Sequence, residues 1–440
     1  MKILHTGDWH LNDALGRVDR TEDLFRSVEQ ISKYLDERAV DVLLIAGDLF
    51  SERSRPDNTR AAIERLKKIF TPFLQRGGTI VAISGNHDSE VLFSTLRDAI
   101  DLVAPGKADS SGTDATGRLW IAPNPRVLKL RGPSGEVVQF LLAPYPTARS
   151  YLQGQKNSFS SIEEKHRVIS TNFLKTLKML QETRIDPALP AVLVSHIHVR
   201  GAQTHTLYRV TEVEDVIFEA DAIPTGWAYA AFGHIHKAQA PLAGSEHVRY
   251  CGSIQKMDMA EAGDDKSVVL FEVGPQGRVG AIELLPLECI SLHRVPISDA
   301  RSELAQLKTL YPDHLTALVQ YELSWLPGRD NRDDLARQIN EIFPRWYARD
   351  FKQLDRVDSK TLSKASVDLH DVAGNVRRFL NEQLASNPSR EDILSLAEEY
   401  LAARGGSSEP NGEEAPQVLE VAVEENARQL LETATVEPRN

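Results

Sequence analysis

Short apolar runs, several of them ending in a glycine followed by a polar side chain, recur along the first half of the chain and constrain its fold most strongly. Strand-like runs at 2–6, 41–46 and 79–84 alternate with helical patterns at about 21–38 and 56–75. Within the first helical pattern, apolar residues recur at helical spacing. Alternation of strands and helices predicts a layered α/β domain.

Further elements of this domain are expected up to about residue 285. A long helix is predicted at about 161–183, a strand at 190–195, and closely spaced strands over 238–285. Thr21 is predicted to be the N-cap of the first helix, because it directly precedes the apolar helical pattern.

A smaller α/β unit and a helical segment are predicted to follow. The unit reads strand, helix, strand, helix and strand, at 290–295, 300–310, 315–323, 333–342 and 346–354. The helical segment carries two apolar stripes, and Ser389–Asp392 has the pattern of a capping box. The last residues are polar and acidic and are expected to be disordered. The sequence therefore predicts four parts, at 1–288, 289–358, 359–404 and 405–440.

Composition excludes several classes of protein. The chain has 440 residues, of which 41% are apolar, so it can bury a core. No run approaches the ~18 consecutive apolar residues that a membrane helix needs. The residues after Met1 lack the pattern of a signal peptide, and two cysteines, Cys251 and Cys289, are too few for a disulfide framework. We therefore expect a soluble, cytoplasmic protein.

Net charge bears on the partners of the chain. The whole chain carries −12, of which residues 405–440 carry −6. An acidic balance argues against a general polyanion binder, although it does not exclude nucleic acid. No clear basic patch is visible in the sequence.

Side chains that can hold metal ions follow five of the predicted strands. The ligand crevice of an open α/β sheet lies outside the carboxyl ends of its strands, so these side chains are expected to converge. They offer carboxylate and amide oxygens and imidazole nitrogens but no thiolate, which suits Mn²⁺, Fe²⁺ or Zn²⁺ better than Mg²⁺ or Ca²⁺. The set consists of Asp8, His10, Asp48, Asn86, His196, His234 and His236.

Seven ligands exceed the needs of one tetrahedral ion, whereas two ions that share one carboxylate use them all. Two cations roughly 3.5–4 Å apart can clamp a phosphate and activate a water for in-line attack. Each motif alone is weak, since a lone aspartate after a strand is usually a cap or turn residue, and a lone histidine pair is more often two unrelated residues. Five such elements in order, each at a strand end, favour the two-metal hypothesis.

These motifs resemble those of the calcineurin-like metallophosphoesterases over about residues 1–285. In detail they are similar to the SbcD-type DNA repair nucleases of bacteria, the counterparts of the Mre nucleases of archaea and eukaryotes. The resemblance rests on Lys2–Leu11, Ala46–Phe50, Gly85–Ser89 and Tyr250–Ser253. It implies an α/β fold built as a layered β-sandwich flanked by helices, with a small α/β capping domain and C-terminal helices.

The same resemblance implies roles for single residues. The ligands would form a first set of Asp8, His10 and His236, a second set of Asn86, His196 and His234, and a bridging Asp48. His87 would contact the scissile phosphate and protonate the leaving oxygen. Asp88 would orient the His87 ring.

Some positions depart from the family pattern or leave a choice. Ser51 and Glu52 stand where the family has an aspartate after the second motif. The fifth motif offers both His196 and His198. We choose His196, because it comes first after the strand, and keep His198 as the alternative. Trp9, which lies between two ligands, is interpreted as a packing residue rather than a platform for base stacking.

Function and partners follow from the resemblance as expectations. It implies a Mn²⁺-dependent nuclease with two divalent metal ions, acting as a double-strand exonuclease and a hairpin or single-strand endonuclease in double-strand break repair. The implied partners are DNA and an SbcC-type coiled-coil ATPase, with a homodimer of the nuclease subunit inside a heterotetramer and no membrane.

Other interpretations stay open. Residues 359–404 would dock the ATPase, although their apolar stripes can equally pack on the protein's own surface. A metallophosphoesterase for small phosphodiesters or phosphoproteins would use the same metals. A non-catalytic scaffold is a third possibility, against which the retention of all seven ligands and His87 argues.

Overall fold

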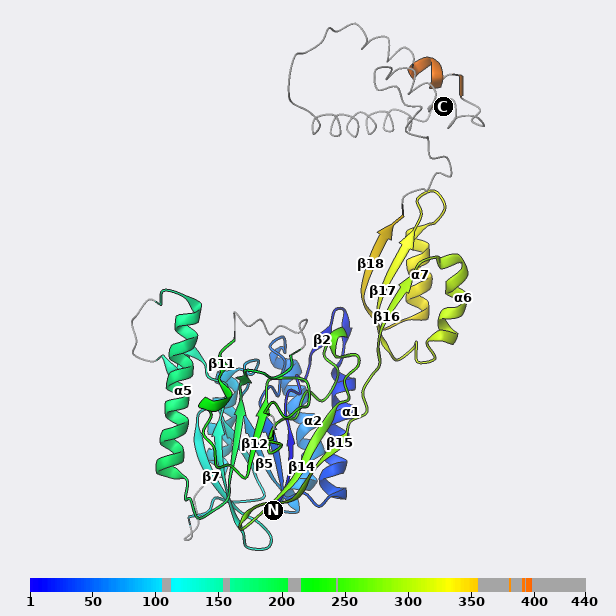
Figure 1. Cartoon of the computed structure of the whole chain (residues 1–440). Helices are drawn as coiled ribbons and strands as arrows, with labels where there is room; N and C mark the ends of the chain where they lie inside the picture. The colour runs from blue at the N-terminus through cyan, green and yellow to red at the C-terminus, as the bar shows by residue number, and fades with distance from the viewer. Residues whose placement is uncertain are drawn as a thin grey trace. The chain divides into compact units, whose positions relative to one another are not determined.

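The computed structural model describes residues 1–104, 112–152, 159–204, 215–242, 244–354, 380, 390, 391 and 393–397. The chain divides into two units, Met1–Arg356 and Val357–Asn440, which are considered separately (Figure 1). The described residues of the second unit are helical. Most of the predicted helical segment, and all of the predicted acidic tail, lie outside the described residues.

The first unit contains two large sheets, one of which has six strands. Their order is β15 (Gly277–Pro286), β14 (Ser267–Gly274), β1 (Lys2–Thr6), β4 (Val42–Ala46), β5 (Thr79–Ile83) and β6 (Leu119–Ala122). Strands β1, β4, β5 and β6 run parallel to one another, and β14 joins β1 antiparallel. The parallel strands are buried runs, as expected for strands covered on both faces.

The other large sheet has five strands. Their order is β13 (Val248–Tyr250), β12 (Tyr229–Gly233), β9 (Ala191–His196), β8 (Val137–Ala143) and β7 (Arg126–Arg131). The two sheets pack face to face, because Ile3 and Leu44 of the first share one buried cluster with Phe140 and Val194 of the second. The first unit is therefore built around a β-sandwich.

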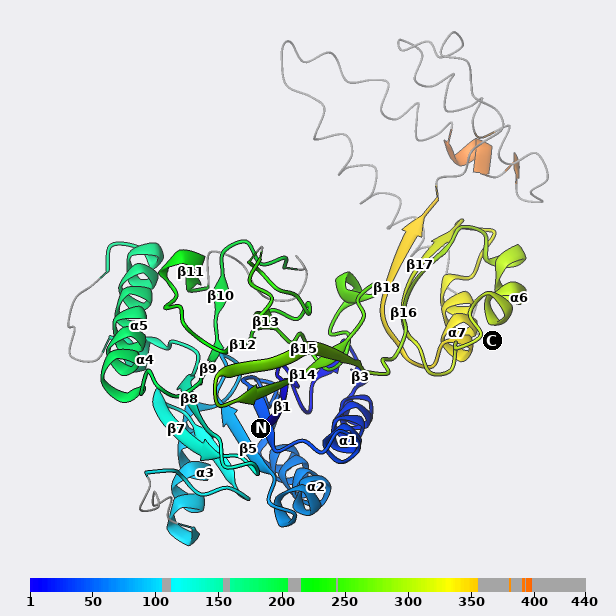
Figure 2. The same cartoon turned by 60° about the horizontal axis from the view of Figure 1, so that its bottom comes forward.

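Helices cover the outer faces of the sandwich (Figure 2). The first sheet is covered by α1 (Thr21–Glu37), α2 (Pro56–Gln75) and α3 (Glu90–Val103). The second is covered by α4 (Ala148–Tyr151) and α5 (Ile162–Arg184). In α1 the buried side chains recur every three to four residues, as in Leu24, Val28, Ile31 and Leu35, so one stripe faces the sheet.

Short elements complete the sandwich: β2 (Ala14–Leu15), β3 (Val18–Asp19), β10 (His198–Val199), β11 (Ile217–Phe218), η1 (Ala220–Ala222) and η2 (Met259–Glu261).

The prediction that Thr21 is an N-cap is wrong. Thr21 is the first residue of α1, and Arg20 at the cap position offers no side-chain hydrogen bond. The Thr21 backbone N–H donates instead to Asp19 Oδ1 at 2.7 Å, so the cap lies earlier in the chain.

The small α/β unit has the element order that its sequence predicts. It contains β16 (Leu292–Ile297), α6 (Ala300–Leu310), β17 (Leu318–Trp325), α7 (Arg332–Ile342) and β18 (Trp346–Gln353). The three strands form one parallel sheet in the order β16-β17-β18. Its own apolar cluster includes Val319, Tyr321 and Phe343.

Within the described parts of the chain, no helix is long and apolar enough to cross a membrane.

Candidate metal centre

The predicted ligands lie at the ends of strands β1, β4, β5, β9 and β12. His196 is the last residue of β9, which runs parallel to β12. The loops after β1 and β4 also bond to each other: the N–H of Asp8 donates to Gly47 O at 3.0 Å, and the N–H of Trp9 donates to Asp48 O at 2.9 Å. The N–H of His234, after β12, donates to Asp8 Oδ1 at 2.9 Å, so the loops of the two sheets meet at one place.

The backbone at the ligands is strained. Asp8, His10, Asp48 and His234 have positive φ angles of 51°, 45°, 51° and 94°. They make up four of the six non-glycine residues with positive φ in the described ranges. Such conformations cost roughly 1–3 kcal/mol each and persist where the surroundings over-determine them, as at active sites.

Glycines allow the loops to approach closely. A Cβ atom on Gly85 would lie 2.0 Å from Asp48 Oδ1, and one on Gly233 would lie 2.0 Å from Ala46 O. Both distances are far below van der Waals contact, so any side chain would push the loops apart. The glycines before Asn86 and His234 are thus needed for packing around the site.

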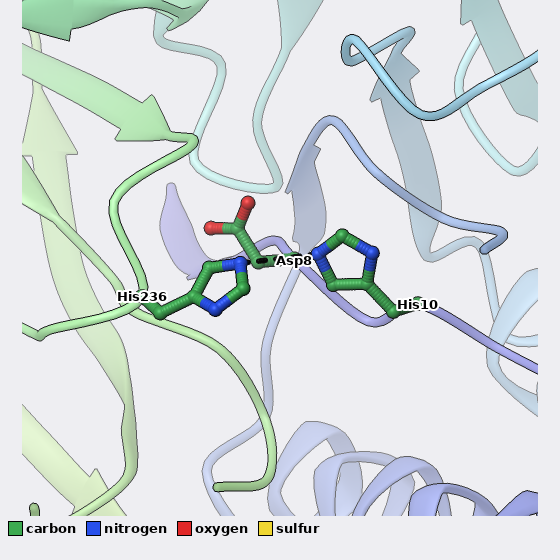
Figure 3. A group of neighbouring side chains, drawn as sticks. All are labelled: Asp8, His10 and His236. Carbon is green, nitrogen blue, oxygen red and sulfur yellow. Dashed lines mark hydrogen bonds between the residues drawn. The ribbon is translucent and has the colours of Figure 1, made fainter. Parts of the chain in front are cut away.

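The first ligand set comes together as predicted. One ligand atom each from Asp8, His10 and His236 lies within 4.8 Å of the others, and all three residues are buried (Figure 3). His10 Nε2 and His236 Nε2 are 3.1 Å apart. Two imidazole nitrogens and a carboxylate so placed form a donor set that suits a divalent transition metal.

The second ligand set meets at the Asn86 amide. Asn86 Oδ1 lies 3.0 Å from His196 Nε2 and 3.0 Å from His234 Nδ1. The Asn86 oxygen therefore faces two imidazole nitrogens from the other sheet.

The Asp48 carboxylate lies between the two sets. Its Oδ2 is 3.6 Å from His10 Nε2 and 3.3 Å from His196 Nε2. Burial alone would raise the pKa of Asp48, but His196 holds it well below its usual range. Burial alone would lower the pKa of His196, but Asp48 raises it to about 9. Cations here would replace that proton, because a ligating imidazole must be neutral.

Two buried acids that sequence analysis missed lie behind the histidines. Glu261 Oε1 is 2.9 Å from His236 Nδ1, and Asp215 Oδ2 is 2.7 Å from His234 Nε2. The backbone oxygen of Ala46 makes the corresponding contact with His196, at 2.7 Å from Nδ1. Neither acid follows a strand end or belongs to a recognisable motif, so no signal in a single sequence marks it.

These outer contacts show that the residues fit metal ions. Each of His196, His234 and His236 has one ring nitrogen beside an oxygen acceptor and its other nitrogen turned toward the ligand set. A neutral ring that donates to the acceptor presents an unprotonated nitrogen on the other side, as ligating histidines do. The two sets thus form a centre that can hold two divalent cations.

His87 lies beside the first ligand set. Its ring centroid is 5.0 Å from that of His10, and its side chain is 12% exposed. Glu52, the residue that departs from the family pattern, has Oε2 at 3.5 Å from His87 Nδ1. Burial lowers the pKa of His87.

Asp88 contacts the backbone of the loops after β4 and β5. Its two carboxylate oxygens accept the backbone N–H groups of Leu49, Phe50 and Gly85, at 3.2, 3.0 and 2.9 Å. Burial raises the pKa of Asp88 to about 7. Glu52 and Asp48 are acids whose carboxylates lie near the His87 ring. The contacts of Asp88 join two ligand loops, and its expected role in orienting the ring stays a prediction.

The two residues that left a choice, His198 and Trp9, are both buried. His198 Nδ1 lies 3.0 Å from Asp215 Oδ2, and these two residues form with His234 a further group that could hold a metal ion, so the choice of His196 stays a prediction. Trp9 is fully buried, stacks on Phe70 with centroids 6.0 Å apart, and donates from Nε1 to Thr6 at 2.9 Å. It is a packing residue.

Comparison with known proteins gives the family. Residues 1–238, more than half of the chain, match the family described as Calcineurin-like phosphoesterase. The chain belongs to the calcineurin-like phosphoesterase family. The predicted α/β class is confirmed with it, as is the expectation of a metal-dependent phosphoesterase.

Several curated relatives share one name, that of the D component of the nuclease SbcCD. The chain is 28% identical over 313 residues to this protein of Escherichia coli K12, and the match covers 70% of this chain and 74% of the relative. Proteins of the same name from Bacillus subtilis and Rhodobacter capsulatus are 26% and 25% identical, each over 62% of this chain and over 67% and 66% of their own lengths. The resemblance predicted from the motifs is thus confirmed.

Proposed function

We propose that this chain is a Mn²⁺-dependent DNA nuclease that acts on double-strand ends and hairpins in double-strand break repair. The observation that carries the proposal is the pair of ligand sets on either side of Asp48, whose members are buried apart from the exposed Asn86. DNA as the substrate is supported by the relatives, which are named nucleases. The mixed oxygen and nitrogen donors favour Mn²⁺ over Mg²⁺.

The protein's own residues would set up phosphodiester hydrolysis. Asp8, His10 and His236 would hold one ion, and Asn86, His196 and His234 the other, with Asp48 between them. When bound, the ions would neutralise the phosphate and make water a stronger nucleophile near neutral pH. The strained, interlocked loops hold these ligands in place before substrate arrives, so little reorganisation is needed.

His87 is the proton donor in this proposal. Its ring lies at the edge of the first ligand set and is partly open to solvent, where a phosphodiester can reach it. An anionic phosphate beside the ring would favour its protonated form, against the effect of burial. The proton would pass to the leaving oxygen. Asp88 would keep the loops after β4 and β5 in register.

The proposed protein partners are an SbcC-type ATPase and a second copy of this chain. The ATPase would dock on 359–404, in the second of the two units. The second copy would dock on α2 and α3, which border an apolar cleft of 340 Å³. Leu102 and Val103 of α3 are each 82% exposed, and a second copy would cover them. Sedimentation of the purified chain tests the dimer.

The proposal is tested with linear duplex, hairpin DNA and a small phosphodiester, each with Mn²⁺ and with a chelator. A DNA nuclease cleaves linear and hairpin DNA only with Mn²⁺, and the ATPase stimulates cleavage. Hydrolysis of the small phosphodiester with intact DNA, with and without the ATPase, would contradict the proposal. It would favour a phosphoesterase for small substrates.

A further inference from the structure

A row of alternating aromatic rings and arginines lies along β18 of the small α/β unit. The Arg349 guanidinium carbon lies 4.7 Å from the centroid of the Trp346 ring and 5.3 Å from that of Phe351. The Arg332 guanidinium carbon lies 5.2 Å from the Phe351 centroid and 5.9 Å from that of Trp325. All four distances allow cation–π attraction. These five side chains form one continuous series, which we call the β18 strip.

The β18 strip is packed on one side, and its Trp346 ring is also covered by Arg17, whose guanidinium carbon lies 4.5 Å from the ring centroid. Trp346 and Phe351 pack against the apolar cluster of their own unit, and Trp346 meets the buried ring of Tyr321 edge to face at 6.1 Å. Arg332 and Arg349 are exposed, and the three aromatic rings are half-buried. Among the described strands, β18 pairs only with β17, so it is an edge strand. The accessible part of the strip therefore consists of the two exposed guanidinium groups and the open parts of the Phe351 and Trp325 rings.

The charge of the strip is only partly neutralised. Arg332 forms an ion pair with Asp333 at 2.9 Å, whereas Arg349 forms none with the residues that the structure describes. No basic patch is visible in the sequence, because Trp325, Arg332 and Trp346 lie on three different elements. Only the fold brings them into one row. A cationic surface with stacked rings stands out on a chain of net charge −12.

We propose that the β18 strip binds unpaired nucleotides of a DNA strand; this inference rests on the proposed nuclease function. Unpaired bases stack on aromatic rings and guanidinium planes with little regard to sequence. Nearby cations attract the phosphates and release counterions. A duplex keeps its bases stacked inside and gains only the phosphate attraction. The strip therefore favours single strands over duplex.

The test measures binding to the full chain in chelator, so that no DNA is cut. The probes are fluorescein-labelled oligothymidylate and a blunt duplex of equal length. We expect Arg349→Gln and Phe351→Leu each to weaken oligothymidylate binding about 5-fold or more, the size of one lost stacking contact, and duplex binding less than about 2-fold. Arg337→Gln is the control, because Arg337 is exposed on α7 and pairs with Asp334 and Glu341 outside the strip.

Two results would overturn the inference. Wild-type affinity for oligothymidylate in both variants, with an altered thermal melt, would show that the strip only stabilises the edge strand. Equal weakening on oligothymidylate and duplex would make it a general charge effect. Arg349→Gln changes an exposed side chain, so it answers the question even if Phe351→Leu folds poorly.

Failure of this inference is distinguishable from failure of the proposed function. If the wild-type chain with Mn²⁺ cuts DNA while the strip variants bind oligothymidylate as the wild type does, only the strip inference fails. If the wild-type chain hydrolyses a small phosphodiester but neither cuts nor binds DNA, both the nuclease proposal and the strip inference fail.

Discussion

One histidine of each ligand set contacts a buried carboxylate. Glu261 accepts from His236 and from Lys266 Nζ, at 2.9 and 2.6 Å, and all three side chains are buried. Asp215 contacts His234 and accepts the Tyr145 hydroxyl at 3.1 Å. One acid thus supports each ligand set, so the two ions are supported separately.

Removing either acid should therefore weaken one ion selectively. We expect Asp215→Asn to weaken the ion held by His234, and Glu261→Gln the ion held by His236, each by about 10–100-fold in affinity. Calorimetric titration with Mn²⁺ resolves the two steps, with a thermal melt to check folding. Asp36→Asn, a change of an exposed acid that pairs with Arg76, is the control. If each substitution weakened both ions equally, separate support would be disproved.

The His87 side chain is expected to matter for rate and not for metal content. His87→Gln should keep both ions and lose about 10²–10⁴ in cleavage rate, the usual contribution of a positioned general acid. Metal analysis and single-turnover cleavage with Mn²⁺ measure the two quantities. Wild-type turnover would remove His87 from the mechanism, and loss of an ion would make it a ligand.

Much of the site could be predicted from single residues because ligands sit in short motifs at strand ends. Asp8, Asn86 and His234 each follow a glycine and an apolar run, which is visible in a sequence. Glu261 and Asp215 could not be found that way, since they reach the site through the fold. The contacts of Asp88 with the loops after β4 and β5 could not be predicted, because its place next to His87 in the sequence does not say where its carboxylate points.

At the scale of loops and strands, metal binding is expected to depend on the close approach of the loops after β4 and β5. Gly85→Ala would place a methyl group 2.0 Å from Asp48 Oδ1, so either the carboxylate or the loop must move. We predict loss of at least one bound ion, measured by metal analysis. Gly263→Ala is a matched control, because Gly263, like Gly85, has no positive φ but has open space around it. Full metal content in Gly85→Ala would show that the loops tolerate the methyl group.

The bounds of single strands were easier to predict than the cap of a helix or the pairing of strands. Strands such as β4 and β5 are continuous apolar runs and were expected almost at their observed bounds. The helix α1 starts at Thr21 as expected, but its cap was misjudged, because Arg20 holds the cap position and Asp19 accepts the Thr21 N–H. The pairing of strands into two facing sheets depends on contacts between distant residues, such as β1 with β14, and local pattern does not contain it.

At the scale of the whole molecule, the first unit is expected to fold alone. It ends at Arg356, and the apolar clusters found among the described residues are made of its own side chains. A chain that ends at Val357 should melt cooperatively and bind Mn²⁺, yet no longer co-purify with the ATPase. Pull-down and a thermal melt check these outcomes. Full partner binding would refute the docking role of 359–404, and a collapsed melt would show that this segment completes the protein's own core.

One carboxylate shared by two ions is the central feature of the proposed nuclease. Asp48 Oδ2 lies 3.6 Å from His10 Nε2 and 3.3 Å from His196 Nε2, one from each ligand set. The most direct test is the number of Mn²⁺ ions bound per chain, measured by calorimetry and metal analysis on the wild type and on Asp48→Ala. We predict two ions for the wild type and none retained at either position for the variant. Two ions retained in Asp48→Ala would contradict the shared-bridge assignment.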